Sequence, residues 1–190
     1  GDVYKRQILD TGCAEGNFTL KIADAVGAKE VYGVDINDKA IKVANSKGIK
    51  AVKYNIENGL PFEDNFFDLV SANQVFEHIN NTNLLFKETF RVLKNKGYAL
   101  ISTPNIAPWH NIAMLLLGMQ PISYHVCEIQ VGNFLKGVTT HGHVKAFTLP
   151  ALVDIAELHG FKVVDTYGCG FYKLPTFLSR ILAKIDKRHA

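Results

Sequence analysis

Short apolar runs alternate along the chain with segments in which apolar residues recur at helical spacing. Apolar runs of this length predict buried strands, and the periodic segments after them predict amphipathic helices. Regular alternation of the two is typical of a parallel sheet covered by helices on both faces. The pattern therefore predicts an α/β fold with one doubly wound, mostly parallel sheet. Strands are expected at 7–10, 30–35, 51–55, 67–73, 98–103 and 161–167, and helices from Asn17 to Val26, Asn37 to Gly48, Thr82 to Gly97, Asn111 to Gly118 and Thr148 to Gly160.

The expected elements form a single domain over residues 1–190, interrupted by one long irregular segment. Residues 106–147 contain only the short helical stretch at 111–118. So long a segment within a compact domain usually carries function, and in a parallel sheet it would lie over the carboxyl ends of the strands. Its apolar side chains either complete the core or form a lid over an apolar substrate.

Composition excludes several classes of protein. Of the 190 residues, 47% are hydrophobic and 21% are charged, which is too apolar for a disordered chain. The longest mostly apolar stretch, residues 112–119, is too short to cross a bilayer. Three cysteines are too few for a disulfide scaffold, so we expect a cytoplasmic protein.

Positive charge is concentrated at the carboxyl end. The formal net charge is +3, and residues 173–190 alone contribute +4 from five basic residues and one acid, so the remainder sums to −1. A near-neutral body argues against general nucleic-acid binding. The basic tail, residues 173–190, also carries apolar side chains on one helical face. Packing onto the domain and binding to a membrane surface both stay open for it.

The sharpest motif is the segment ILDTGCAEGNFT. Its strand ends at Asp10, its turn runs through Gly12 and Gly16, and a helix follows. Glycine permits the tight turn and lets the backbone approach a ligand at the helix N-terminus. The next strand ends in Asp35, and a carboxylate there can accept hydrogen bonds from both hydroxyls of a ribose. This order of elements predicts a ligand that contains adenosine.

The residues within the turn narrow the choice of ligand class. A dinucleotide fingerprint has three glycines facing a pyrophosphate, whereas Glu15 would place negative charge beside it. Gly12-Cys13-Ala14-Glu15-Gly16 instead resembles motif I of the class I S-adenosylmethionine-dependent methyltransferases, with Ala14 at a position where that family usually has glycine. The resemblance continues through NIENGLPFEDNFFDLVSANQVFEHI, RVLKNKGYALISTPN and HVKAFTLPALVDIAELHGF, and the last segment is similar to the small-molecule methyltransferases related to the ubiquinone-biosynthesis enzymes.

The resemblance implies a Rossmann-like methyltransferase fold, S-adenosylmethionine as cofactor, and a set of binding residues. Asp35 would bind the ribose, Ile36 the adenine ring, and Asn55 with Ile56 the adenine edge. Asn55 stands where the family more often has aspartate, and a turn-forming amide is its alternative role. The glycine turn would hold the methionine portion, and Asn73 would meet its amino group. The cofactor residues predicted in this way are Asp10, Gly12, Cys13, Ala14, Gly16, Asp35, Ile36, Asn55, Ile56 and Asn73.

A catalytic base is needed only if the methyl acceptor must lose a proton, and histidine suits an alcohol or phenol. His143, which opens the family-like HVKAFT, is the preferred candidate, with a surface or hydrogen-bonded role as its alternative. His78 more plausibly shapes the cofactor pocket, and His159 more plausibly interacts with a helix end. The pairs His125-x-Cys127 and His141-x-His143 match no zinc pattern, so no metal is expected.

The expected activity is methyl transfer to a small or lipid-like acceptor, at oxygen rather than nitrogen or carbon. The N-P-P-aromatic motif of nucleobase methyltransferases is absent after the fourth strand, where SANQVFEH stands. A nicotinamide-dependent oxidoreductase and a non-catalytic cofactor-binding module are the alternatives.

The two ends of the chain suggest a fragment. Residues 1–7, GDVYKRQ, resemble translated adaptor sequence rather than native protein, and nothing after Tyr167 reads as a strand. We therefore expect a sheet truncated to six strands, with an open position where the family's seventh strand belongs.

Overall fold

The computed structural model of the chain describes residues 6–122, 124, 126–140, 142–168 and 176–189. These residues fall into two compact units. Residues 1–76 together with 81–102 make up the first unit, and residues 77–80 together with 103–190 make up the second. Each unit is described by itself, and the expected single domain of 190 residues stays a prediction.

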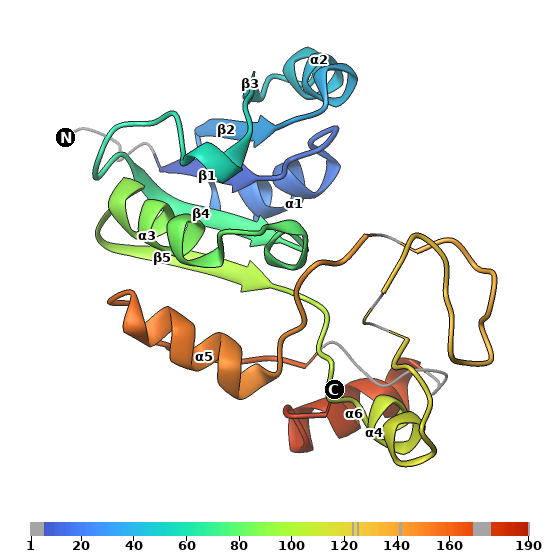
Figure 1. Cartoon of the computed structure of the whole chain (residues 1–190). Coiled ribbons are helices and arrows are strands. Elements are labelled where there is room, and N and C mark those ends of the chain that lie inside the picture. The colour runs from blue at the N-terminus through green and yellow to red at the C-terminus, as the bar shows by residue number, and fades with distance from the viewer. Residues whose placement is uncertain (1–5, 123, 125, 141, 169–175, 190) are drawn as a thin grey trace. The chain divides into compact units, whose positions relative to one another are not determined.

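The first unit is built on a five-stranded parallel sheet (Figure 1). Its strands follow the order β3-β2-β1-β4-β5. The first strand of the chain lies in the middle of the sheet, and later strands are added on both sides of it. This is the doubly wound arrangement that the alternating pattern predicts. The strands are β1 (Gln7–Thr11), β2 (Glu30–Asp35), β3 (Lys50–Lys53), β4 (Phe67–Asn73) and β5 (Leu93–Ser102).

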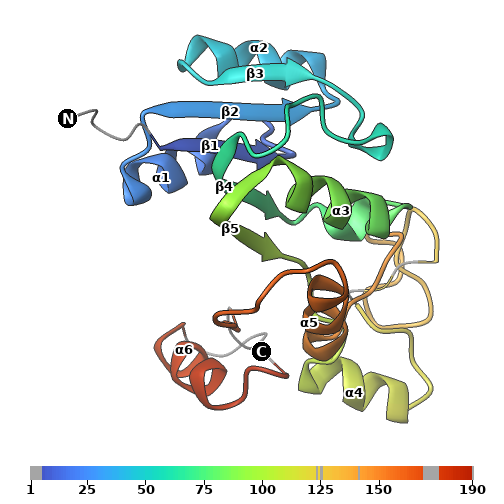
Figure 2. The same ribbon diagram turned by 90° about the vertical axis from the view of Figure 1, so that its left-hand side faces the viewer.

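Helices cover both faces of this sheet. Parallel strands joined by right-handed crossovers place α1 and α2 on one face and α3 on the other, as Figure 2 shows for α1 and α3. These helices are α1 (Asn17–Val26), α2 (Asp38–Ser46) and α3 (Thr82–Val92), with short 3₁₀ turns η1 (Ile56–Asn58) and η2 (Phe76–His78) between strands and helices.

Local chemistry explains where the helices begin and where the core lies. The Asn37 side chain accepts hydrogen bonds from the backbone of Lys39 and Ala40, so it caps α2 as expected. Ile8 and Leu9 of β1 are almost fully buried because β1 is the central strand, with helices against both of its faces.

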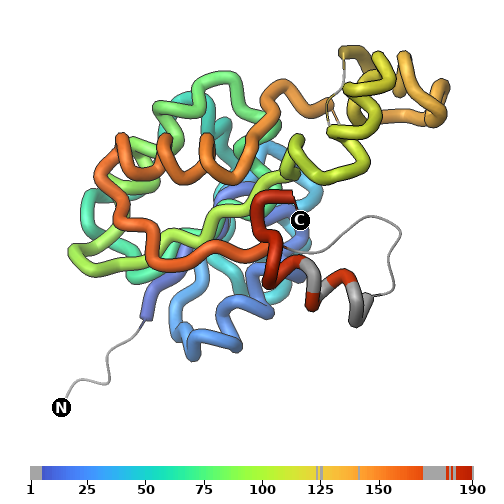
Figure 3. The backbone as a smooth tube through the Cα atoms, turned by 90° about the horizontal axis from the view of Figure 1, so that it is seen from below, coloured from blue at the N-terminus to red at the C-terminus, as the bar shows by residue number. Residues whose placement is uncertain are grey.

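The second unit contains three helices among its described residues. They are α4 (Trp109–Leu116), α5 (Leu149–Leu158) and α6 (Thr176–Ile185). Thr148 caps α5, as expected, by accepting a hydrogen bond from the backbone of Ala151. After α4 the chain turns back (Figure 3): the backbone of Ile122 donates to the buried Asn111 side chain, and the backbone of Gln120 donates to the carbonyl of Gly132 at 2.9 Å.

Three expectations about the elements are wrong. Residues 161–168 form no strand and pair with no described residue in a ladder, so the described sheet has five strands rather than six. An apolar, β-branched run becomes a strand only where a partner satisfies its backbone groups. Helix α3 ends at Val92 rather than near Gly97, because β5 already begins at Leu93. Phe90, which recurs at helical spacing with the apolar residues Leu85, Phe86 and Leu93, is 49% exposed rather than buried.

Candidate functional site

The predicted glycine turn connects β1 to α1 at the carboxyl edge of the sheet. The backbone N–H groups of Gly12 and Cys13 donate to the carbonyl of Val34, at 2.7 and 3.1 Å, which ties the turn to β2. Gly12, Ala14 and Gly16 have φ values of 72°, 45° and 79°. Left-handed conformations at alternate positions need residues with small or no side chains. The turn therefore presents bare backbone at the start of α1.

Asp35, the last residue of β2, is held in place by this turn. One carboxylate oxygen accepts from the Ala14 N–H at 2.9 Å, and the other accepts from the Asn37 N–H at 2.8 Å. A carboxylate offers about four lone-pair sites, so further donors such as ribose hydroxyls still find acceptors. The carboxylate that the sequence singles out is thus fixed beside the glycine turn.

Asp10 and Cys13 face the protein interior. Asp10 is 3% exposed and accepts a hydrogen bond from the Thr19 hydroxyl at 2.5 Å, and burial raises the pKa of its carboxyl. Cys13 packs among the side chains of Ile41, Ala44 and Ile49, and burial raises the pKa of its thiol to about 12. Both side chains stabilise the turn. Because they point inward, a cofactor at this edge would meet the backbone of Asp10 and Cys13, and this contact stays a prediction.

The remaining predicted cofactor residues lie at the same edge. Ile36 follows β2 and is 64% exposed, so its side chain is available to pack against a ring. Asn55 caps η1 by accepting from the Glu57 N–H at 3.0 Å, which is the turn-forming role weighed against adenine binding. Its neighbour Ile56 begins η1. Asn73 ends β4, and its side-chain oxygen accepts from the Ser102 hydroxyl at 2.5 Å.

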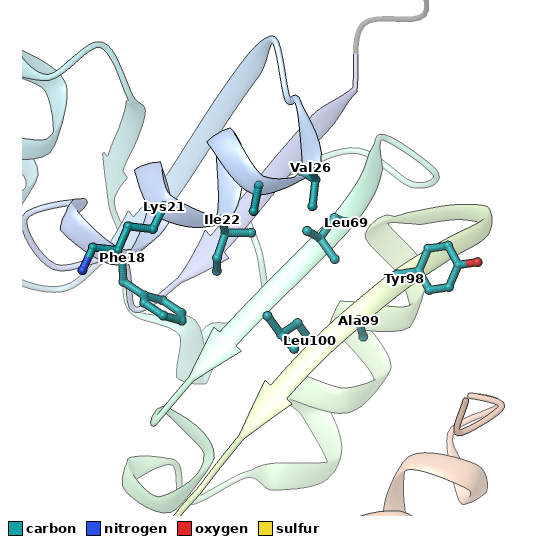
Figure 4. A pocket seen from close by; sticks show the side chains of 9 residues that line it. Phe18, Lys21, Ile22, Val26, Leu69, Tyr98, Ala99 and Leu100 are labelled. Carbon is teal, nitrogen blue, oxygen red and sulfur yellow. The ribbon is translucent and has the colours of Figure 1, made fainter. Parts of the chain in front are cut away.

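The first unit thus brings together all ten predicted cofactor residues, because parallel strands β1 to β4 end at one edge of the sheet. A separate apolar pocket lies between α1 and strands β4 and β5 (Figure 4). None of the ten residues lines it; its lining includes Phe18, Ile22, Leu69 and Leu100. The pocket therefore lies apart from the predicted cofactor residues at the glycine-turn edge.

Histidines are distributed differently from the cofactor residues. His143, the predicted base, lies in the second unit with its ring centroid 5.0 Å from that of His78. His159 ends α5, and its Nδ1 lies 2.8 Å from the Ile155 carbonyl, as the helix-end role predicts. His125 and His141 lie outside the described residues.

Glu77 is a residue that the sequence analysis did not single out. It precedes His78 in η2 and is 1% exposed, although it is an ionisable residue. The signal that could have found it is an acid four residues after a buried strand and next to a histidine.

Residues 9–101 match the family model of a methyltransferase domain. A probable S-adenosylmethionine-dependent methyltransferase of Mycolicibacterium smegmatis is 27% identical over 97% of this chain and 60% of its own length. The demethylmenaquinone methyltransferase of Lactococcus lactis is 33% identical over 51% of this chain and 41% of its own length. An S-adenosylmethionine-dependent methyltransferase from Archaeoglobus fulgidus has the same fold, with a TM-score of 0.65, 20% identity, and coverage of 98% of this chain and 80% of that one.

Residues 9–101 therefore form a methyltransferase domain of the class I S-adenosylmethionine-dependent type, and the first unit adopts its Rossmann-like fold. This match confirms the resemblance drawn from the glycine turn, and it implies S-adenosylmethionine as the cofactor. The chain spans about 60% of the mycobacterial relative and less of the lactococcal one. Among the described residues, no helix is both long and apolar enough to cross a membrane.

Proposed function

We propose that this protein transfers a methyl group from S-adenosylmethionine to a small or lipid-like acceptor, at an oxygen atom. The observation that carries the proposal is Asp35, whose carboxylate both anchors the glycine turn through Ala14 and retains acceptor sites for a ribose. A cytoplasmic location belongs to the same proposal.

The residues at the carboxyl edge fit this cofactor. Asp35 would hold the ribose and Ile36 would pack on the adenine ring, whose edge Asn55 and Ile56 would contact. The turn from Gly12 to Gly16 would hold the methionine portion with backbone N–H and C=O groups. The turn carries Glu15 and no basic side chain, which suits a cofactor without phosphates better than a dinucleotide. When bound, S-adenosylmethionine supplies an electrophilic methyl group on a sulfonium.

The chain's own contribution to methyl transfer is alignment and, for an oxygen acceptor, removal of a proton. Positioning the acceptor and excluding water provide most of the rate enhancement in such a displacement. His143 is half-buried and next to His78, so it can take a proton from an acceptor hydroxyl. The lipid-like character of the acceptor is supported by the similarity to a demethylmenaquinone methyltransferase.

The cofactor assignment is tested by calorimetric titration with S-adenosylhomocysteine and, in parallel, with NADH. We expect saturable binding of the first and none of the second. Asp35→Ala should weaken S-adenosylhomocysteine binding by about 2 kcal/mol, because charge-assisted hydrogen bonds to the ribose are lost. Asp38→Ala, which removes an exposed carboxylate that pairs with Lys42, is the matched control and should bind normally. Binding of NADH alone would show that the chain is an oxidoreductase.

The acceptor is identified by transfer of labelled methyl groups to a panel of phenols, alcohols, amines and quinols. His143→Ala should lower turnover more than it lowers cofactor affinity, since the residue is assigned to the acceptor. Failure to methylate any acceptor, with cofactor binding intact, would favour a non-catalytic cofactor-binding module.

A membrane-surface role for the basic tail belongs to the same proposal. The tail includes α6, on which Ile181 and Ile185 are one turn apart and exposed, close to the basic Lys184. Flotation with anionic liposomes, compared with neutral ones, measures this interaction; equal recovery with both would exclude it.

A further inference from the structure

The second unit gathers two imidazoles around a carboxylate, that of Glu77, to which the proposed function gives no role. Glu77 and His78 come from η2, and His143 comes from the segment that leads into α5. One ligand atom from each lies within 4.8 Å of the other two. We propose that Glu77, His78 and His143 bind a divalent transition-metal ion, of which Zn²⁺ fits their chemistry best. This replaces the sequence-based expectation that the protein binds no metal.

The environment of Glu77 is the first reason for a cation. Its side chain is almost fully buried, and neither carboxylate oxygen has a hydrogen-bond partner among the residues that the structure describes. A buried charge without a partner is strongly unfavourable, so proteins pair such groups or use them to coordinate metals. A bound cation would supply the missing partner of both oxygens.

The backbone that brings the third residue to the site is the second reason. The Glu77 carbonyl accepts from the N–H groups of Val144 and Lys145, at 2.7 and 3.1 Å. These bonds fix the segment that contains His143 against η2. The rings of His78 and His143 consequently meet edge to face, with an interplanar angle of 71°. The site is therefore held by main-chain hydrogen bonds that do not depend on a metal.

The kind of ion follows from the kind of ligands. Imidazole nitrogen favours zinc and its neighbours in the first transition series, whereas Mg²⁺ prefers oxygen ligands and water. Three protein ligands would leave a tetrahedral ion one position for water or another oxygen ligand, such as an acceptor hydroxyl. With the ion bound, His143 would act on the acceptor as a ligand of that ion and not as a free base. Ligand atoms around a tetrahedral Zn²⁺ are separated by roughly 3.4 Å, given bond lengths near 2.1 Å. Closing from 4.8 Å requires rotation of the side chains of the exposed His78 and the half-buried His143.

The competing explanation is a metal-free cluster that side-chain packing and the main-chain hydrogen bonds alone hold together. Both explanations place the same side chains together, but only the first predicts saturable metal binding with a stoichiometry of one. Binding is measured without any methyl acceptor or S-adenosylmethionine, so its outcome is independent of the proposed transferase activity.

The test is isothermal titration of the chelator-treated full chain with Zn²⁺, and optical titration with Co²⁺ as a spectroscopic probe. We expect one Zn²⁺ per chain, a d–d spectrum of four- or five-coordinate Co²⁺ without a thiolate band, and no displacement by millimolar Mg²⁺. A thiolate band would assign the ion to a cysteine such as the exposed Cys127 and would overturn the proposal.

Substitutions of the three proposed ligands test where the ion binds. Glu77→Gln, His78→Gln and His143→Gln should each weaken Zn²⁺ binding by at least tenfold and abolish the Zn²⁺-dependent rise in Tm. The matched control is His159→Gln, a histidine of the same unit that is bound to its own helix and should leave Zn²⁺ affinity unchanged. His78 and His143 are not fully buried, so their variants keep the test decisive if Glu77→Gln does not fold. Absence of stoichiometric binding by the wild type, or unchanged binding in both histidine variants, would establish the metal-free cluster.

Discussion

At the scale of single residues, the glycine turn depends on positions that tolerate no side chain. Gly16 combines a φ of 79° with close packing, because an added Cβ would lie 2.1 Å from Cδ1 of Ile49. Gly27, at the end of α1, has a φ of 64° but no atom within 4 Å of the same position. Substitutions at Gly16 and Gly27 therefore separate the cost of a left-handed backbone from the cost of a steric clash.

We expect Gly16→Ala to lower the free energy of unfolding by about 3 kcal/mol, from left-handed strain and overpacking together. Gly27→Ala should cost only about 1 kcal/mol, because it introduces strain without a clash. Urea unfolding of the two variants measures the difference. Equal losses would mean that Ile49 moves aside without cost.

Cys13 offers a second test of the turn. With the pKa of its thiol raised to about 12 by burial and by the carboxylates of Asp10 and Asp35, the thiolate fraction at pH 8 is about one in ten thousand. Iodoacetamide should therefore label the exposed Cys127 at pH 8 and leave Cys13 unmodified, as followed by peptide mass spectrometry. The control is the urea-unfolded chain, in which both should react. Rapid labelling of Cys13 in the folded protein would show that the turn opens.

At the scale of elements, Arg91 ties α3 to the loop that precedes β4. Its guanidinium donates to the carboxylates of Glu88 and Asp64, and also to the backbone carbonyls of Leu60 and Phe62, at 2.6 to 3.0 Å. Glu88 in turn accepts from the Leu60 N–H at 2.9 Å. Arg91 is therefore a structural residue that fixes the path of the chain between η1 and β4.

Arg91→Lys should destabilise the protein by about 2 kcal/mol, because lysine cannot reproduce the planar fork of donors. Lys87→Ala, an exposed change on the same helix, is the control and should have little effect.

Arg91 holds the pKa of Glu88 below its ordinary value. A carboxyl whose pKa is lowered by folding stabilises the protein at pH values above its unfolded-state pKa, and this stabilisation is lost as the pH falls. The difference in the free energy of unfolding between wild type and Arg91→Ala should therefore narrow below about pH 4.5. A constant gap would indicate that the neutral contacts dominate.

At the scale of the whole first unit, one face of the sheet is incompletely covered. The pocket between α1, β4 and β5 leaves Phe18, Tyr98 and Leu100 exposed by 43%, 64% and 46%, and β5 is the last strand in the sheet order (Figure 4). Clustered exposed apolar side chains beside a strand edge favour association between molecules.

Phe18→Lys together with Leu100→Lys should reduce binding of the dye ANS and slow aggregation, while changing the free energy of unfolding little. The control is Leu158→Lys, which alters a side chain that is 82% exposed on α5 and does not line the pocket. Light scattering and dye fluorescence measure the effect. Equal improvement from both changes would show that net charge, rather than this face, governs solubility.

The sequence by itself determined the elements whose signals are local. The boundaries of α1, β2 and β4, the Asn37 and Thr148 caps, and the path from Gly12 to Asp35 follow from periodicity, capping and glycine positions within a few residues of one another. Tertiary structure alone decided the rest, because it depends on partners distant in the chain. Residues 161–168 form no strand without a described partner, and Cys13 faces the core because α2 and β3 pack over it. Glu77 and His143 lie 66 positions apart, and hydrogen bonds from the backbone of Val144 and Lys145 to the Glu77 carbonyl bring the two segments together.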